Sequence, residues 1–211
     1  MEHGRIGGEP LVNVKIYIEG GGEGELLDTY FRQGWSQFFK KAAGMAGKMP
    51  RIVRGKGRQR TFDLFVTAIK NRKPNELPLM LVDSEDPVQQ GHTVWEHLKI
   101  RDNWDRPDGA SDDQAFLMVQ VMESWFLADW EMLVSYFGPN FRQNAFREWP
   151  SLESLSKADV YDFLEMATAT RVKKQYKKGK ISFEMLAKLD PVKVENACPH
   201  AKELMKRLRK L

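Results

Sequence analysis

A short apolar run near the middle of the chain restricts the fold most strongly. The segment LPLMLV, residues 77–82, contains no charged side chain and is followed at once by the acidic sequence DSED. A strand that is apolar on both faces has to be covered on both faces, which is typical of the parallel strands of α/β proteins. We therefore expect a buried strand of a parallel sheet at this position.

Strand and helix patterns alternate along the first part of the chain. Apolar residues recur at helical spacing over three segments, and short apolar runs suited to strands lie between them. The expected strands cover residues 12–18 and 51–54, and the expected helices cover about 23–43, 61–71 and 93–100. This alternation is the signature of a parallel sheet with helices on both faces. The sequence therefore predicts an α/β, Rossmann-like sheet of about four strands.

The last strand of this pattern has two interpretations. The run AFLMVQV, residues 115–121, is almost entirely apolar, so periodicity does not separate a buried strand from a buried helix. One long helix is an alternative, with Ser111 and Gln114 forming a capping box at its start. We favour a strand followed by a helix that begins near Glu123, because the pattern becomes amphipathic only from there.

The pattern changes after residue 150. Helical periodicity appears in short pieces, at about residues 157–169, 183–189 and 199–211, which are separated by Asp-Pro and Cys-Pro pairs. We expect an α/β domain over residues 1–150 and a helical C-terminal extension over residues 151–211 that packs on it.

The overall composition is that of an ordinary soluble globular protein. The 211 residues are 42% hydrophobic and 29% charged. No apolar run approaches the roughly 18 residues of a membrane-spanning helix, so we expect no membrane span. The single cysteine, Cys198, cannot form a disulfide within the chain, which suits the reducing cytoplasm.

Acidic residues follow three of the expected strands. Glu19 follows the first strand, Asp83 the apolar run at 77–82, and Glu123 the last strand, with Glu85 and Asp86 close behind Asp83. The carboxyl ends of parallel strands share one edge of the sheet, where open α/β folds bind ligands. Carboxylates gathered there raise one another's pKa, and a bound Mg²⁺ or Mn²⁺ would relieve that conflict. This arrangement suits phosphoryl transfer.

The glycine-rich segment after the first strand favours a metal over a phosphate. The sequence EGGGEGE, residues 19–25, lacks both the spacing and the lysine of a phosphate-binding glycine loop. Its glutamates would repel a phosphate, whereas glycine lets the backbone and a substrate approach closely. We expect this segment to serve a hard divalent cation.

Two segments are strongly basic. RIVRGKGRQR, residues 51–60, and RVKKQYKKGK, residues 171–180, contain no acidic residue. Basic clusters of this kind steer polyanions toward a protein. The residues that we expect to contact a nucleic-acid backbone are Arg51, Arg54, Lys56, Arg58, Arg60, Lys173, Lys174 and Lys177.

The acidic motifs resemble those of the Toprim fold, the domain shared by topoisomerases, bacterial primases, OLD-family nucleases and nucleases of phage defence. IYIEGGGEGELL looks like its first motif, a strand ending in glutamate beside glycine, and LMLVDSED looks like its acidic D-x-D motif. The segment MESWFLAD is similar to one found in an uncharacterised bacterial family of Toprim-like proteins, commonly encoded beside AAA-type or ABC-type ATPases. The resemblance covers most of residues 12–137.

The resemblance implies a role for each acidic residue. Glu19 would act as general acid or base and as a metal ligand, and Asp83 would be the first metal ligand of the acidic motif. Glu85 takes the place of the second aspartate of that motif, although the sequence D-S-E-D leaves Asp86 as an alternative. Glu123 would add a ligand or hold a second metal.

The expected function is therefore that of a Mg²⁺-dependent nuclease that hydrolyses phosphodiesters of DNA or RNA. The resemblance further implies a partner ATPase and a bacterial defence system. One alternative is a noncatalytic partner or regulatory subunit that uses the same scaffold and its basic surfaces for docking. Another is a phosphotransferase that processes nucleotides.

Overall fold

A parallel β-sheet forms the centre of the molecule. The computed structural model describes residues 12–139, 141–142, 149–169 and 175–211, and within them the sheet has four strands in the order β2-β1-β3-β4. The strands are β1 (Asn13–Ile18), β2 (Arg51–Arg54), β3 (Glu76–Asp83) and β4 (Ala115–Met118). All three pairings are parallel, so the predicted α/β architecture with a parallel sheet of four strands is confirmed.

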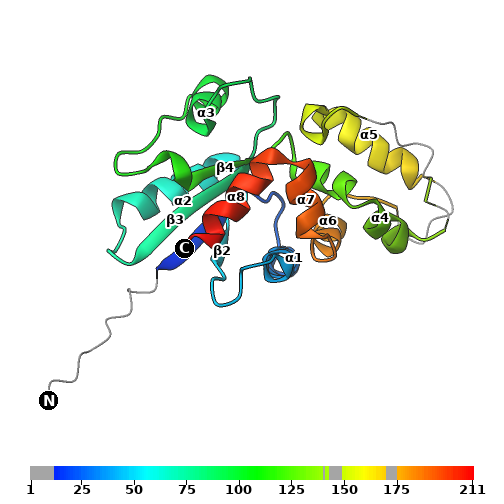
Figure 1. The fold of residues 1–211 in the computed structure, drawn as a ribbon, viewed down its shortest axis with the longest axis horizontal. Helices are drawn as coiled ribbons and strands as arrows, with labels where there is room; N and C mark the ends of the chain where they lie inside the picture. The colour runs from blue at the N-terminus through cyan, green and yellow to red at the C-terminus, as the bar shows by residue number, and fades with distance from the viewer. Residues whose placement is uncertain (1–11, 140, 143–148, 170–174) are drawn as a thin grey trace, which may run out of the picture.

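The helices follow the strands in alternation and then continue alone to the C-terminus (Figure 1). The α-helices are α1 (Glu25–Lys41), α2 (Arg58–Lys70), α3 (Val94–Asp102), α4 (Trp130–Phe137), α5 (Lys157–Ala167), α6 (Lys180–Leu186), α7 (Pro191–Ala197) and α8 (Pro199–Arg209). Short 3₁₀ turns are η1 (Asp112–Gln114), η2 (Met122–Ala128) and η4 (Leu152–Ser154). In the described part of the chain, no helix has both the length and the apolar character that a bilayer crossing requires.

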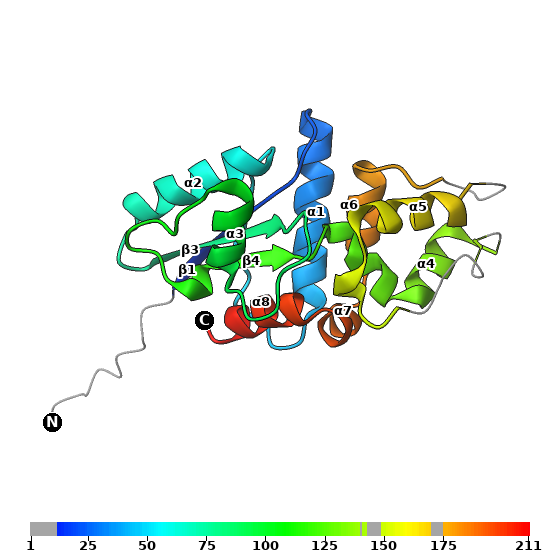
Figure 2. The ribbon, with the colours of Figure 1, turned by 90° about the horizontal axis from the view of Figure 1, so that it is seen from above.

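The register of the strands brings their carboxyl ends to a common edge. Ile18 of β1 pairs with Leu81 of β3, and Asp83 of β3 pairs with Met118 of β4. The backbone N–H of Glu19 continues the ladder and donates to the carbonyl of Leu81 at 2.9 Å. In Figure 2 the arrows of β3 and β4 point toward the side of the molecule where α4, α5 and α6 lie.

One face of the sheet is covered by α2 and α3. Alternate residues of the strands point to opposite faces, and Tyr17, Met80 and Val82 share one of them. They pack with Phe65 of α2 and Trp95 of α3 in one buried apolar cluster. This explains why the run at 77–82 contains no polar position: both faces of β3 are buried.

The opposite face packs against α1 and the C-terminal helices. Ile16 and Leu79 belong to a second buried cluster, together with Phe31 and Trp35 of α1 and Leu204 of α8. Helix α1 keeps one stripe of large apolar residues at helical spacing, which is the periodicity that the sequence displays.

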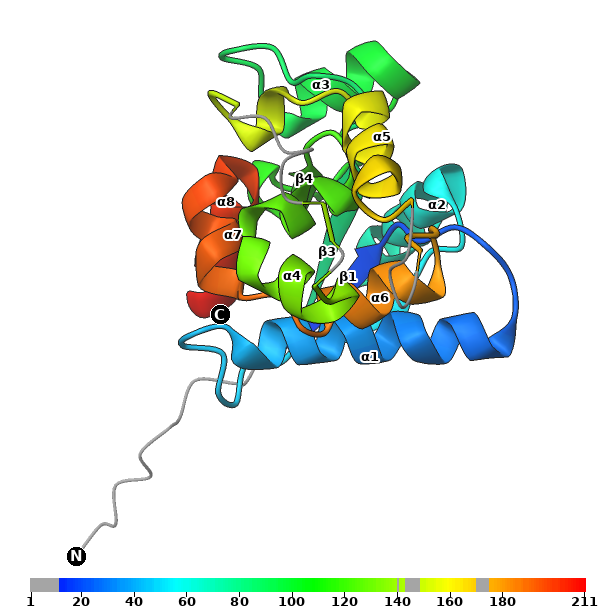
Figure 3. The ribbon, with the colours of Figure 1, turned by 90° about the vertical axis from the view of Figure 1, so that its right-hand side faces the viewer.

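The residues predicted as a C-terminal extension share this second cluster. Leu164 of α5, Phe183 of α6 and Val194 of α7 are buried within it. Helix α6 lies alongside α1 (Figure 3), and a Cβ placed on Gly34 would lie 2.7 Å from the carbonyl oxygen of Phe183. Glycine at position 34 thus permits the close approach of these two helices.

Two element boundaries differ from the predictions. The last strand exists, and a single long helix is excluded, but β4 ends at Met118 and a 3₁₀ turn, η2, precedes α4. Helix α7 was not predicted, because Asp190-Pro191 reads as a break between helices. The side chain of Asp190 accepts a hydrogen bond from the N–H of Val192, and the proline occupies the first turn, so the pair begins a helix.

Candidate functional site

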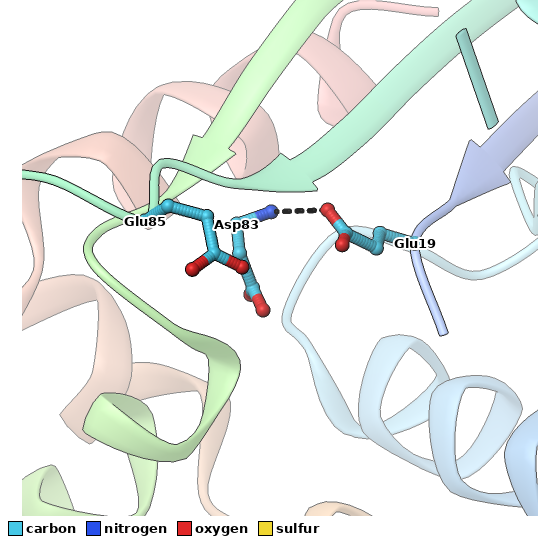
Figure 4. A group of neighbouring side chains, drawn as sticks. All are labelled: Glu19, Asp83 and Glu85. Carbon is cyan, nitrogen blue, oxygen red and sulfur yellow. Dashed lines mark hydrogen bonds between the residues drawn. The ribbon is translucent and has the colours of Figure 1, made fainter. Parts of the chain in front are cut away.

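Three carboxylates meet at the carboxyl edge of the sheet. Glu19 directly follows β1, Asp83 is the last residue of β3, and Glu85 lies two positions further on. One carboxylate oxygen from each lies within 4.8 Å of the others. Figure 4 shows the Asp83 and Glu85 side chains turned toward the same space, with Glu19 approaching from the neighbouring strand. The convergence predicted for Glu19, Asp83 and Glu85 is present in the structure.

Asp83 is the most deeply buried member of this carboxylate group. Its Oδ1 accepts a hydrogen bond from the backbone N–H of Met122 at 2.9 Å. Burial, followed by the nearby charges of Glu19 and Glu123, raises the pKa of Asp83 well above its usual range. A buried carboxylate beside other carboxylates resists ionisation unless a cation compensates it.

Glu19 is partly buried and is oriented by two donors. Its Oε2 accepts hydrogen bonds from the backbone N–H of Asp83 at 3.2 Å and from Nη1 of Arg58 at 3.1 Å. Burial raises the pKa of Glu19, and the positive charge of Arg58 opposes that shift. The first of these bonds is the dashed line in Figure 4.

Glu85 has an unusual backbone conformation. Its φ of 64° places it in the left-handed region, which L-residues with a side chain seldom adopt. Its N–H donates to the carbonyl of Gln120 at 2.8 Å, and its carboxylate pairs with Lys157 of α5. Such a conformation, maintained by surrounding contacts, is typical of functional sites. Here it turns the Glu85 side chain toward Asp83.

The structure separates Glu85 from Asp86. The Asp86 carboxylate is 66% exposed and lies 3.2 Å from Nε of Arg101. Of the two candidates for the second position of the acidic motif, Glu85 therefore joins the carboxylate group, and Asp86 lies outside it.

Glu123, predicted as a further metal ligand, also lies outside the carboxylate group. It is buried, and its oxygens accept hydrogen bonds from Tyr176 at 3.0 Å, Ser182 at 3.2 Å and Tyr161 at 3.2 Å. Because β4 ends at Met118, Glu123 lies within η2 and not directly at the end of a strand. Three hydroxyl donors thus hold Glu123, which lines the same cavity as the carboxylate group but is not part of it.

Arg58, predicted to contact nucleic acid, belongs to the site itself. Its guanidinium donates to both carboxylate oxygens of Asp102, at 2.9 and 2.6 Å, and lies 5.0 Å from the ring centre of Trp104. The same guanidinium donates to Glu19 and to the backbone carbonyl of Asp83. The Arg58 guanidinium is consequently a fixed part of the acidic edge, the edge of the sheet that carries Glu19, Asp83 and Glu85.

Arg54 does not lie at the surface, where a nucleic acid would meet it. Its side chain is 2% exposed and pairs with Asp28 of α1. The guanidinium also donates to the carbonyls of Gly20 at 3.3 Å and Gly22 at 2.9 Å, and to that of Gly21. The glycine-rich segment therefore wraps around an internal arginine, and a Cβ at Gly20 would lie 2.5 Å from the ring of Phe31.

The other basic residues predicted to contact nucleic acid lie in different surroundings. Four of them are exposed: Arg51, Lys56, Arg60 and Lys177. The Nζ of Lys56 lies 3.2 Å from the Asp28 carboxylate. The remaining two predicted contacts, Lys173 and Lys174, lie outside the described residues.

A cavity of about 330 Å³ opens beside the three carboxylates. The glycine-rich segment forms part of its wall, and the C-terminal part of the chain supplies another part through Lys178 and Ser182. The predictions missed Lys157 and Lys178 as neighbours of the acidic edge. The basic run at 171–180 was the available signal, but it does not disclose which of its lysines faces the cavity.

The donors present at the acidic edge fit a hard divalent cation. Mg²⁺ and Mn²⁺ prefer carboxylate oxygens, and Glu19, Asp83 and Glu85 offer such oxygens at mutual distances that one ion can bridge. Burial raises the pKa values of Asp83 and Glu19, and the neighbouring carboxylates add to the rise, so a cation bound there would favour their ionised forms. A group of three carboxylates that could bind a metal ion is thus present.

The fold and this edge define an α/β protein with a Rossmann-like parallel sheet and a candidate site for a divalent cation. Over residues 18–209 the sequence matches the family described as "Domain of unknown function (DUF4276)", and the chain belongs to this family. The match includes both the strand ends that carry the carboxylates and the C-terminal helices. No curated protein and no solved structure matches the chain.

Proposed function

We propose that this protein is a Mg²⁺- or Mn²⁺-dependent nuclease of the Toprim type, which hydrolyses phosphodiesters of DNA or RNA. The observation that carries the proposal is the meeting of Glu19, Asp83 and Glu85 at the carboxyl edge of a parallel sheet, beside an open cavity. A shared set of carboxylates at this position suits metal-assisted hydrolysis of a phosphate ester.

The residues have distinct roles in this proposal. Asp83 and Glu85 hold the cation, with Glu19 beside them as a further ligand. A divalent cation held there would supply Lewis-acid polarisation of the phosphoryl group and a more acidic attacking water. Glu19 would accept or return the proton, because its carboxylate lies at the edge of the cavity and is oriented by the N–H of Asp83 and by Arg58.

Arg58 maintains this arrangement as a positioning residue. Because its guanidinium is held by Asp102 on one side, it presents Nη1 to Glu19 in a constant direction. A carboxylate that is held by a charge-assisted hydrogen bond keeps the orientation that proton transfer requires.

The resemblance to Toprim-like proteins supplies the rest of the proposal. It suggests that the protein works in the bacterial cytoplasm with an AAA-type or ABC-type ATPase, in defence against phage. In that setting the ATPase would control access of DNA or RNA to the acidic edge.

The first test is a calorimetric titration of Mn²⁺ into the wild type and into Asp83→Ala. We expect saturable binding in the wild type and its loss in the variant. Absence of binding in the wild type would contradict a metal site and favour a noncatalytic partner or regulatory subunit.

The second test compares two glutamates of the same segment. We expect Glu19→Gln to abolish Mn²⁺-dependent cleavage of plasmid DNA and of a single-stranded RNA. Glu23→Gln, a change at an exposed position of the glycine-rich segment, should leave cleavage unchanged. Full activity of Glu19→Gln would overturn the assignment.

A further inference from the structure

The C-terminal part of the chain brings a lysine to the acidic edge. Lys178 lines the same cavity as Glu19, Asp83 and Glu85. Burial and neighbouring carboxylates raise the pKa of Asp83, and the positive charge of Lys178 acts against that rise. Lys178 and the carboxylate group therefore share the wall of one cavity.

A tyrosine holds the Lys178 side chain in place. Nζ of Lys178 donates to the hydroxyl oxygen of Tyr161 at 2.7 Å and lies 5.2 Å from the centre of its ring. Tyr161 in turn donates to the Glu123 carboxylate at 3.2 Å. Two consecutive hydrogen bonds thus connect Lys178 through the Tyr161 hydroxyl to the buried Glu123.

The backbone that carries Lys178 is anchored to the same acidic residue. Tyr176 and Ser182, which flank it in sequence, both donate to Oε1 of Glu123, at 3.0 and 3.2 Å. Burial and the charge of Glu123 raise the pKa values of Tyr161 and Tyr176, so both hydroxyls remain donors. Glu123 therefore organises the segment on which Lys178 lies.

The lysines beside Lys178 have other surroundings. Lys177 is exposed and does not line the cavity. Lys180 lies 4.6 Å from the ring centre of Tyr30, and its Nζ is 3.6 Å from Glu184. Of these three lysines, only Lys178 lines the cavity.

Lys178 differs from the other cations near the cavity in its ion pairing. Arg58 pairs with Glu19 and Asp102, and Lys157 pairs with Glu85. Among the described residues, Lys178 has no carboxylate partner within ion-pair distance, and its hydrogen bond goes to a neutral hydroxyl. It can therefore offer its charge to a ligand in the cavity.

A phosphodiester that enters this cavity needs such a charge. Arg58 and Lys157 are already paired with Glu19 and Glu85, so a phosphate in this cavity gains little attraction from them. We propose that Lys178 binds a nonbridging oxygen of the substrate phosphate, while Tyr161 and Glu123 act as positioning residues for it. This inference rests on the proposed function and specifies its substrate contact.

The test measures binding separately from hydrolysis. Binding of a fluorescein-labelled single-stranded DNA is followed by anisotropy in Ca²⁺, and hydrolysis of bis(p-nitrophenyl) phosphate is followed in Mn²⁺. We expect Lys178→Met to weaken DNA binding and raise KM by about tenfold or more. Lys178→Arg should stay within about threefold of the wild type, because the charge is kept. The control Lys177→Met should bind and react as the wild type does.

A second pair of variants tests the positioning by Tyr161. Tyr161→Phe removes the hydroxyl that contacts Lys178, whereas the control Tyr136→Phe removes a hydroxyl that donates to Glu184 and does not line the cavity. We expect KM to rise in Tyr161→Phe and to stay near the wild-type value in Tyr136→Phe. Equal KM values in the two variants would overturn the positioning role.

The outcomes separate this inference from the proposed function. If the wild type binds Mn²⁺ and hydrolyses the ester, but Lys178→Met retains its KM and its DNA affinity, the inference alone is wrong. If the wild type neither binds Mn²⁺ nor hydrolyses the ester, the proposed function fails and the inference fails with it. If Lys178→Met binds Mn²⁺ as the wild type does but loses DNA affinity and has a raised KM, the result supports both the proposed function and this inference.

Discussion

Nη1 of Arg58 lies 3.1 Å from Oε2 of Glu19 and donates a hydrogen bond to it. The two residues are far apart in sequence, since one begins α2 and the other follows β1. Their contact joins a helix to the edge of the sheet where the candidate site lies. Because Asp102 holds the other side of the guanidinium, the orientation of Glu19 depends on three separate elements.

The Arg58 contacts predict a large loss of stability when the arginine is removed. In Arg58→Met, Asp102 and Glu19 both lose a cation while they stay largely buried, which should cost about 3 kcal/mol of unfolding free energy. The exposed neighbour Arg60 serves as the control. Arg60→Met should change the free energy of unfolding by no more than about 0.5 kcal/mol. Urea denaturation measures both. Equal stabilities would show that the Arg58 contacts contribute little.

The separation of Glu85 from Asp86 predicts which of the two binds a metal. Glu85→Gln should lower the affinity for Mn²⁺ by about tenfold or more, because a neutral amide replaces a ligand carboxylate. Asp86→Asn should leave the affinity within about twofold, since Asp86 pairs with Arg101 at the surface. Calorimetric titration of both variants decides the matter. The opposite ranking would exclude Glu85 as the second acidic ligand.

The raised pKa of Asp83 predicts how the stability of the metal-free protein depends on pH. The folded state keeps a proton on Asp83 at pH values where the unfolded chain has lost it. Stability therefore falls as pH rises from the usual pKa of 3.8 through the raised folded value, and stays reduced above it. Asp83→Asn lacks this penalty and keeps an oxygen that accepts from Met122.

Thermal unfolding in EDTA measures this effect. We expect Asp83→Asn to melt at least about 3 °C above the wild type at pH 8, since each kcal/mol moves the midpoint of a chain of this size by about 2–4 °C. The difference should shrink as pH falls toward 4. Added Mn²⁺ should stabilise the wild type and not the variant. A variant that melts below the wild type at pH 8 in EDTA would contradict the burial of an uncompensated Asp83 charge.

The close packing of α1 against α6 predicts that alanine is not tolerated at position 34. Helix propensity by itself favours Gly34→Ala by about 1 kcal/mol. The new Cβ would lie 2.7 Å from the carbonyl of Phe183, and relief of that overlap should make the variant less stable than the wild type by about 1–2 kcal/mol. At Gly21, a Cβ meets nothing within 4 Å, so Gly21→Ala is the control. A stabilised Gly34→Ala would show that the two helices are further apart.

Much of the fold was predictable because its signals are local. Apolar runs and helical periodicity report the burial of each segment, and they located all four strands and most helices. The same reasoning placed Glu19 and Asp83 together, since parallel strands deliver their carboxyl ends to one edge. Asp190-Pro191 shows the limit: the same two residues can end one helix or begin another.

The glycine-rich segment shows how a neighbour in space changes an interpretation. The sequence suggested that Arg54 contacts a nucleic acid and that the segment serves a metal. The structure places the Arg54 guanidinium inside the segment, where it satisfies backbone carbonyls. No pattern within residues 51–60 distinguishes a buried arginine from an exposed one.

The sequence by itself thus determined the succession of strands and helices along the chain and the acidic character of one sheet edge. Only the tertiary structure decided that Glu85 joins that edge, that Glu123 binds hydroxyl groups from the C-terminal segment, and that Lys178 faces the cavity. The physical reason is that burial and periodicity are properties of neighbouring residues in the chain. The partners of a charged side chain are chosen by packing between segments far apart, such as Glu123 and Tyr176.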